Sequence, residues 1–110
     1  MSFSVLMSVY DREKPEYLSK ALDSIIQQTL QPDEIVLIKD GPLPTELENV
    51  IEKKRKTYSQ FVIYQFEENV KLGKALAKGL GLCRYELVAR MDSDDIALPQ
   101  GNTIGRTGEE

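Results

Sequence analysis

Three carboxylates stand close together near the end of the chain, in the segment Leu87–Pro99 with the sequence LVARMDSDDIALP. Asp92 and Asp94 are two positions apart, so in extended backbone both side chains project to the same side. Their mutual repulsion is relieved by a cation or by solvent. Mg²⁺ and Mn²⁺ prefer oxygen ligands and bind one or two carboxylates together with phosphate oxygens and water. The triplet therefore predicts a metal site that bridges the protein to a pyrophosphate and stabilises a negatively charged leaving group.

A calcium loop and a purely structural role are the alternatives to this metal site. A calcium-binding EF-hand loop that began at Asp92 would need a ligand at its fifth position and a glycine at its sixth, where the sequence has Ile96 and Ala97. An EF-hand is therefore excluded. Acidic residues after a strand are also common as solvated turn formers or helix caps. The triplet alone leaves that structural role open.

Apolar segments of two kinds alternate along the chain and predict an α/β fold. Continuous, partly β-branched runs, typical of strands buried on both faces, occupy Phe3–Tyr10, Glu34–Asp40, Phe61–Phe66 and Glu86–Met91. Between them, apolar residues recur at helical spacing within residues 18–26, 47–51 and 72–83. Pro15 suits the first turn of the first helix, and Thr45 with Glu48 has the spacing of a capping box for the second.

The order of these segments predicts where a ligand would bind. A β-α-β-α-β-α-β series with short connections indicates a three-layer αβα arrangement around a mostly parallel sheet of about four strands. Such sheets bind ligands at the carboxyl ends of their strands, where the strand order reverses. Acidic or amide residues follow all four expected strands, at Asp11, at Asp40, at 67–69 and at 92–95. One edge of the sheet is thus expected to carry a polar site.

Composition excludes several classes of function. The 110 residues suffice for one compact domain, and the formal net charge of −4 argues against a non-specific nucleic-acid binder. With no histidine and only Cys83, the chain can have no internal disulfide, no zinc site of the Cys/His type and no Ser–His or Cys–His catalytic pair. No apolar run reaches the ~20 residues of a membrane span. We expect a cytoplasmic protein, with the inner face of the membrane as the alternative place of action.

Several segments together resemble the opening part of the inverting glycosyltransferases of sequence family 2. Residues 3–42 share the family's pattern of an apolar strand, a turn with Pro-Glu-Tyr-Leu, a helix ending in Gln-Gln-Thr, and a strand ending in Asp-Gly. The segment ENVKLGKALAKGL is similar to the family's Asn-containing loop and the helix after it, and ARMDSDD is similar to its D-x-D metal motif. The resemblance runs in order over residues 3–99. It is closest to transferases of bacterial capsular and extracellular polysaccharides, of the amylovoran type.

The resemblance implies the Rossmann-like, nucleotide-binding half of a GT-A fold over residues 1–99, with a nucleotide-diphosphate sugar, most often a UDP-sugar, as the donor. By position, Ser8, Val9 and Tyr10 would line the nucleoside pocket. Tyr10 would supply an aromatic contact, with simple packing at a strand end as the alternative. Asp40 would accept a hydrogen bond from the imide N–H of uracil, a proton that cytosine lacks. An Asp-Gly turn is the alternative role for Asp40.

For the acidic triplet, the resemblance implies a division of roles around a bound metal ion. Asp92 would face the ribose or the water shell of the metal, and Asp94 would bind Mn²⁺ or Mg²⁺ directly. Asp95 would lie outside the metal's own ligands or cap a helix. In the loop before the third helix the sequence departs from the family, which often has Gly where Lys71 stands. Lys71 and Lys74 could contact phosphates, although lysines on a helix more commonly form a solvated face.

The chain also differs from the family in length. Family members continue into an acceptor-binding half, which supplies the Asp or Glu that acts as general base on a saccharide or lipid-linked acceptor. No residue after Asp95 suits that role, so we expect a truncated chain that binds the donor at best, with little or no sugar transfer. Residues 100–110 have no apolar period and the composition of a disordered or artificial tail.

Two other functions stay open on the sequence. A receiver-like signalling domain also places Mg²⁺-binding aspartates at parallel strand ends. It needs paired acids after the first strand, where Asp11 stands without an adjacent acid, and a phosphoacceptor aspartate after a middle strand. A non-functional fragment is the other alternative, and its exposed apolar surface and open sheet edges would favour self-association.

Overall fold

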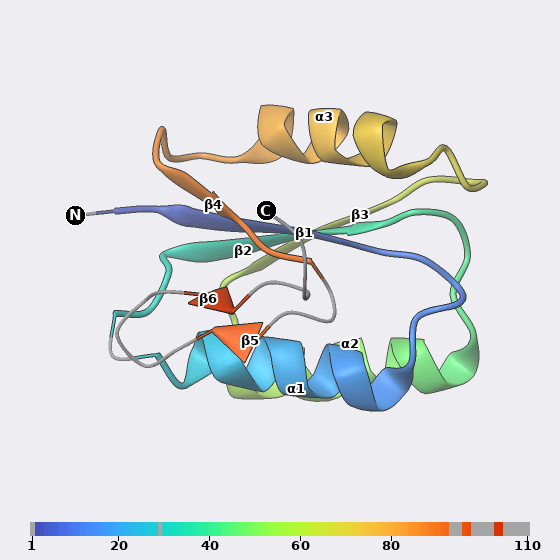
Figure 1. Ribbon diagram of the computed structural model, residues 1–110, viewed down its shortest axis with the longest axis horizontal. Helices are drawn as coiled ribbons and strands as arrows, with labels where there is room; N and C mark the ends of the chain where they lie inside the picture. The colour runs from blue at the N-terminus through green and yellow to red at the C-terminus, as the bar shows by residue number, and fades with distance from the viewer. Residues whose placement is uncertain (1, 29, 93–95, 98–102, 105–110) are drawn as a thin grey trace.

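The computed structural model describes residues 2–28, 30–92, 96–97 and 103–104 of the chain. Its main sheet has the strand order β3-β2-β1-β4, with all neighbours parallel. The strands are β1 (Ser4–Val9), β2 (Glu34–Lys39), β3 (Phe61–Gln65) and β4 (Val88–Arg90). Helices α1 (Pro15–Ile26) and α2 (Thr45–Thr57) cover one face of the sheet, and α3 (Leu72–Leu82) covers the other (Figure 1). The predicted three-layer α/β fold is confirmed.

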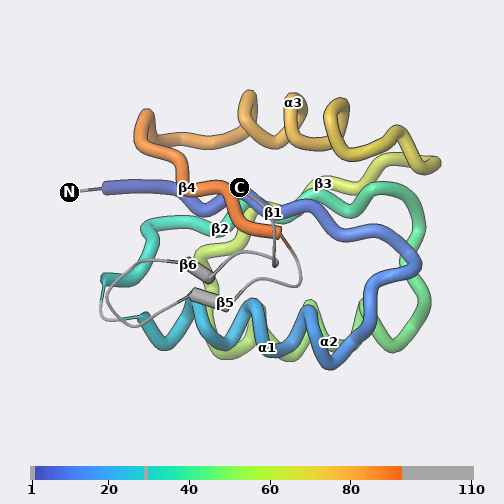
Figure 2. Tube along the Cα trace, in the orientation of Figure 1, coloured from blue at the N-terminus to red at the C-terminus, as the bar shows by residue number. Residues whose placement is uncertain are grey.

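The direction of winding reverses at β1. From β1 the chain passes through α1 to β2 and through α2 to β3 on one side of the sheet, and it then crosses the opposite face through α3 to reach β4 (Figure 2). The register pairs Val9 with Lys39 and Leu6 with Arg90. The carboxyl ends of β1, β2 and β4 therefore meet at one edge, which is where open α/β sheets bind ligands.

Alternation along β1 separates the core into two layers. Val5, Met7 and Val9 belong to the larger cluster, in which the sheet packs against α1 and α2. Leu6 lies in the smaller cluster on the α3 side, together with Val36, Ile38 and Ala75. Because successive side chains of a strand point to opposite faces, Ser8 and Tyr10 share the face of Leu6. The end of β1 thus presents polar groups on the α3 side of the sheet.

Helix α3 lies close to the sheet because of a glycine. A β-carbon at Gly79 would clash with Cδ1 of Leu6 and would lie 2.9 Å from Cγ1 of Ile38. Any side chain at this position would push the helix away from β1 and β2. The close approach sets the height of α3 above the sheet, and with it the position of its first turn at the carboxyl edge.

The capping box predicted for α2 is not formed. Pro44 is the N-cap residue, with φ −63° and ψ 159°, and Thr45 is already the first residue of the helix. The proline ring fixes φ at this value, so the N-cap lies one residue earlier than the prediction placed it. The carboxylate of Glu48 is engaged elsewhere, since it accepts a hydrogen bond from Nζ of Lys39 at 2.6 Å.

A second, two-stranded sheet follows the main one. Strands β5 (Ile96–Ala97) and β6 (Thr103–Ile104) pair antiparallel, and β5 lies beside α1. Two residues of the stretch 100–110 are therefore in a strand, and the others lie outside the described residues. The domain boundary at residue 99 stays a prediction. Among the described residues, no helix is long and apolar enough to span a membrane.

Candidate functional site

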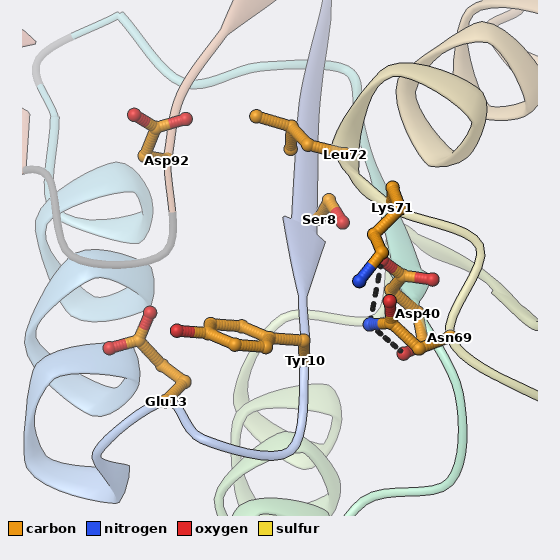
Figure 3. A pocket seen from close by; sticks show the side chains of 8 residues that line it. All are labelled: Ser8, Tyr10, Glu13, Asp40, Asn69, Lys71, Leu72 and Asp92. Carbon is orange, nitrogen blue, oxygen red and sulfur yellow. Dashed lines mark hydrogen bonds between the residues drawn. The ribbon is translucent and has the colours of Figure 1, made fainter.

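A pocket of about 320 Å³ opens where the carboxyl ends of β1, β2 and β4 meet the first turn of α3. Its lining residues come from segments far apart in the chain and are shown as sticks in Figure 3: Ser8, Tyr10, Glu13, Asp40, Asn69, Lys71, Leu72 and Asp92. The volume is at the lower end of the roughly 300–1,000 Å³ that small-molecule sites occupy. Polar residues at the carboxyl ends of three strands thus converge on one pocket, as the sequence predicted for this edge.

Asp40 is the most firmly held side chain of the site. The residue is 5% exposed. Its Oδ1 accepts the backbone N–H of Val70 at 2.7 Å, and its Oδ2 accepts Nδ2 of Asn69 at 3.2 Å. The backbone N–H of Asp40 donates to the carbonyl oxygen of Val9 at 2.8 Å, which continues the pairing of β2 with β1. A carboxylate has about four acceptor positions, so Asp40 retains capacity for a ligand N–H.

The next residue explains why the loop after β3 can reach Asp40. Gly41 has a φ of +99°, and a β-carbon on it would lie 3.0 Å from the backbone nitrogen of Asn69. The Asp-Gly turn considered as an alternative is therefore present, and the Asp40 side chain lines the pocket as well. The turn and the binding role are compatible because the glycine forms the bend while the carboxylate holds the loop.

The structure places the three residues expected from β1 on two different faces. Ser8 and Tyr10 line the pocket, and the ring of Tyr10 lies along it with 45% of the residue exposed (Figure 3). Val9 does not line it, because its side chain is 1% exposed and packs in the larger core cluster. The strand's period of two is the reason. A role of Val9 in binding the nucleoside stays a prediction, and its side chain faces the core.

Of the acidic triplet, Asp92 is the member that the structure describes. It follows β4 and lines the pocket, and its Oδ1 lies 3.6 Å from a guanidinium nitrogen of Arg90. Asp94 and Asp95 lie outside the described residues, so their predicted roles stay predictions. Among the described residues, no group of three His, Cys, Asp or Glu side chains could hold a metal ion. The carboxylate of Asp92 at the pocket is a suitable oxygen donor for Mg²⁺ or Mn²⁺, and a complete site would need Asp94 as well.

The pocket also contains Glu13 and Leu72, which the sequence did not single out, and Lys71, which it considered as a phosphate contact. Glu13 lines it, whereas Asp11, the acidic residue that was expected to follow β1 into the site, is exposed and outside the lining. Leu72 and Lys71 contribute from the start of α3. The positions of acidic residues after the strands could not distinguish Asp11 from Glu13, because the turn between β1 and α1 decides which of them points inward.

The comparisons with known proteins agree with this geometry. The sequence matches the family model described as glycosyl transferase family 2 over residues 4–102. The chain belongs to glycosyl transferase family 2. This membership decides against the receiver-like alternative. The resemblance to amylovoran-type enzymes is confirmed, since the chain is 50% identical over 98 residues to the amylovoran biosynthesis glycosyltransferase AmsE of Erwinia amylovora.

A second relative is the Escherichia coli UDP-Gal:alpha-D-GlcNAc-diphosphoundecaprenol beta-1,3-galactosyltransferase, which is 46% identical over 94 residues. The matches cover 89% and 86% of this chain but 36% and 34% of the two relatives. The chain thus spans about a third of the length of the curated relatives it matches.

Solved structures show the same fold. Staphylococcus aureus TarS 1-349, determined in complex with UDP, superposes with a TM-score of 0.77 at 28% identity and covers 91% of this chain and 29% of its own. The mannosyltransferase PcManGT from Pyrobaculum calidifontis, in complex with GDP-Man and Mn²⁺, has a TM-score of 0.76 at 17% identity, over 89% of this chain and 29% of its own. Together these likenesses confirm the GT-A fold that the resemblance implied.

Proposed function

We propose that the pocket binds the nucleotide of a nucleotide-diphosphate sugar, with a uridine nucleotide favoured, as the donor site of a glycosyltransferase. The carrying observation is the convergence of Ser8, Tyr10, Asp40 and Asp92 on a single pocket at the reversal point of the sheet. These residues come from the ends of three different strands. They supply an aromatic ring, a buried hydrogen-bond acceptor and, at the far side of the pocket, a carboxylate. A base, a ribose and a metal-bound diphosphate require groups of these kinds.

The buried carboxylate supports the preference for uracil. Asp40 can accept the imide N–H of uracil, which cytosine does not carry. The ring of Tyr10 lies along the same pocket and can cover a face of the base (Figure 3). The Escherichia coli relative is named for UDP-Gal, and the TarS structure is a complex with UDP. Both names are consistent with a UDP-sugar as the donor of this protein.

A divalent metal, Mn²⁺ or Mg²⁺, fits the carboxylate at the other side of the pocket. We assign its binding to Asp94, with Asp92 beside it. When bound, such an ion neutralises the diphosphate and stabilises it as a leaving group. The chain's own part is to hold the base and ribose, so that the diphosphate lies at these carboxylates. The relative PcManGT was determined with Mn²⁺, and its likeness supports the fold alone.

For the whole protein we propose transfer of the sugar, with inversion, to a saccharide or lipid-linked acceptor in the cytoplasm. Inversion by single displacement needs a general base at the acceptor hydroxyl. Of the carboxylates that line this pocket, one is assigned to the nucleobase, one is assigned to the metal, and the third lies beside Tyr10. We therefore expect the 110-residue chain to bind the donor and to transfer little or no sugar.

The test is a calorimetric titration of UDP into the protein, with and without Mn²⁺. We expect binding that strengthens with Mn²⁺, and at least a tenfold loss in Asp94→Ala, because the ion then loses a ligand. Glu46→Gln is the matched control. It removes one exposed carboxylate from the first turn of α2, on the other face of the sheet, and should bind UDP like the wild type. A folded wild-type protein that binds no UDP under either condition would instead support the non-functional fragment.

A further inference from the structure

We propose that Lys71 reads the base of the nucleotide, by donating a hydrogen bond from its ammonium group to a carbonyl oxygen next to the N–H that Asp40 accepts. The inference rests on the proposed function, since it assumes that a base lies against Asp40. It makes Lys71 a specificity-determining residue of the donor site. The observations that carry it are the backbone of Lys71, the contacts that hold this backbone, and the charges in the pocket.

The backbone of Lys71 has a conformation that suits glycine. Its φ is 78° and its ψ is 159°, and it is the one non-glycine residue with positive φ among the described residues. This region of φ and ψ is occupied almost only by glycine, because a β-carbon collides there with the neighbouring peptide groups. Strain of this kind persists where the surrounding structure imposes it, and it gathers at functional sites.

Contacts on both sides impose this conformation. Directly before Lys71, the backbone N–H of Val70 donates to Oδ1 of Asp40 at 2.7 Å, and Gly41 allows the loop to pack against the end of β2. Directly after it, the carbonyl oxygen of Lys71 accepts the N–H of Ala75 at 3.0 Å in the first turn of α3. The loop is thus held at Asp40 and at the helix, and residue 71 has to bridge them. Glycine would do so without strain, so a lysine here indicates a use for its side chain.

The charges in the pocket favour a ligand as that use. Of the eight described lining residues only Lys71 is basic, while Glu13, Asp40 and Asp92 are acidic. Two other basic residues next to strand ends of the site are engaged, because Lys39 pairs with Glu48 at 2.6 Å and Arg90 with Asp92 at 3.6 Å. Lys71 forms no ion pair with any described residue. Its ammonium group is therefore available to a bound molecule.

The position of the side chain favours the base over the diphosphate. Figure 3 shows Lys71 extending into the pocket on the side of Asp40, while Asp92 lies on the other side, beyond Ser8. In the proposed function the metal and the diphosphate belong at Asp92, and the base belongs at Asp40. An acceptor and a donor side by side match an N–H with an adjacent carbonyl, which is the edge that uracil presents.

The experiment measures two quantities on each variant, the affinity for uridine and UDP by NMR titration and the Tm. Lys71→Ala keeps the β-carbon and removes the ammonium group. We expect about a 10- to 100-fold loss of affinity, equal for uridine and UDP, with no rise in Tm. Lys71→Gly should lose the same affinity and gain ~5 °C in Tm, because the strain is removed as well. Lys71→Arg should retain binding within about threefold.

Lys56→Ala is the matched control, since Lys56 is an exposed lysine in the last turn of α2, on the other face of the sheet, and it should bind like the wild type. Wild-type binding that is unchanged in Lys71→Ala would overturn this inference and leave the proposed function intact. A loss confined to UDP would move the contact to the diphosphate and overturn the assignment to the base. A wild type that binds neither ligand would overturn the proposed function, and this inference with it.

Discussion

Cys83 closes α3 at the amino end of the sheet, the edge opposite the pocket. Its Sγ donates to the carbonyl oxygen of Gly79 at 3.3 Å. Burial raises the pKa of the Cys83 thiol above its ordinary value of 9.0, the nearby carboxylate of Glu34 raises it further, and a hydrogen bond with Ser4 opposes both. Glu34 is itself fixed there, since its Oε2 accepts the hydroxyl of Ser4 and the backbone N–H of Arg84, each at 2.6 Å.

The raised pKa predicts how stability changes with pH. As the pH rises past 9.0, the unfolded chain loses the thiol proton before the folded protein does, so the free energy of unfolding falls. Cys83→Ala lacks this proton and is the reference. The difference in unfolding free energy between wild type and Cys83→Ala should be constant from about pH 7 to 8 and should shrink towards about pH 10. Urea unfolding at each pH measures it, and a difference that stays constant throughout would contradict the raised pKa.

Single residues also mark the limit of what the sequence could predict about the site. Asp40 and Tyr10 line the pocket at the strand ends where the sequence placed them, and their roles in binding stay predictions. The period of a strand already assigns the side chain of Val9 to the face opposite Ser8 and Tyr10. The backbone of Lys71 could not be predicted. It depends on a hydrogen bond between Val70 and Asp40, which are 30 positions apart in the chain.

At the scale of elements, substitutions of the two glycines near the C-terminal end of α3 should change the stability of the protein in opposite directions. Gly79→Ala would place a methyl group against Leu6 and Ile38, and overpacking of this kind costs ~1–3 kcal/mol. Gly81→Ala is the matched control in the same helix, because a β-carbon there meets nothing within 4 Å. Alanine is the better helix former, so Gly81→Ala should stabilise the protein by ~0.5–1 kcal/mol. Thermal unfolding followed by circular dichroism measures both, and equal Tm values for the two variants would show that α3 does not pack closely at Gly79.

The elements themselves were largely predictable because their apolar periods are long and uninterrupted. The expected strand Phe3–Tyr10 contains β1, and the apolar positions from Leu72 to Cys83 coincide with α3. The prediction that failed concerned the start of α2. The capping box at Thr45 has the right residue types, but the preceding proline already holds the extended backbone that a cap requires.

At the scale of the whole molecule, β3 forms one edge of the described sheet. The N–H of Ile35 donates to the carbonyl oxygen of Gln60 at 2.8 Å, and the N–H of Phe66 donates to that of Lys39 at 3.0 Å. Residues 60 and 66 therefore turn their backbone groups towards β2, and by alternation 61, 63 and 65 turn theirs away. The strand's sequence, FVIYQ, has no lysine or proline, the residues that commonly protect an edge from pairing.

This open edge gives the predicted self-association a specific place. We expect the mean mass of the wild-type chain, measured by sedimentation velocity, to rise with concentration as β3 pairs with β3 of a second copy. Gln65→Pro removes one outward N–H from an exposed residue without breaking the ladder to β2, and it should stay monomeric. Tyr17→Ser is the control, because it removes an exposed ring on α1 and leaves the edge intact. Association that persists in Gln65→Pro and disappears in Tyr17→Ser would transfer the contact from the sheet edge to the α1 face.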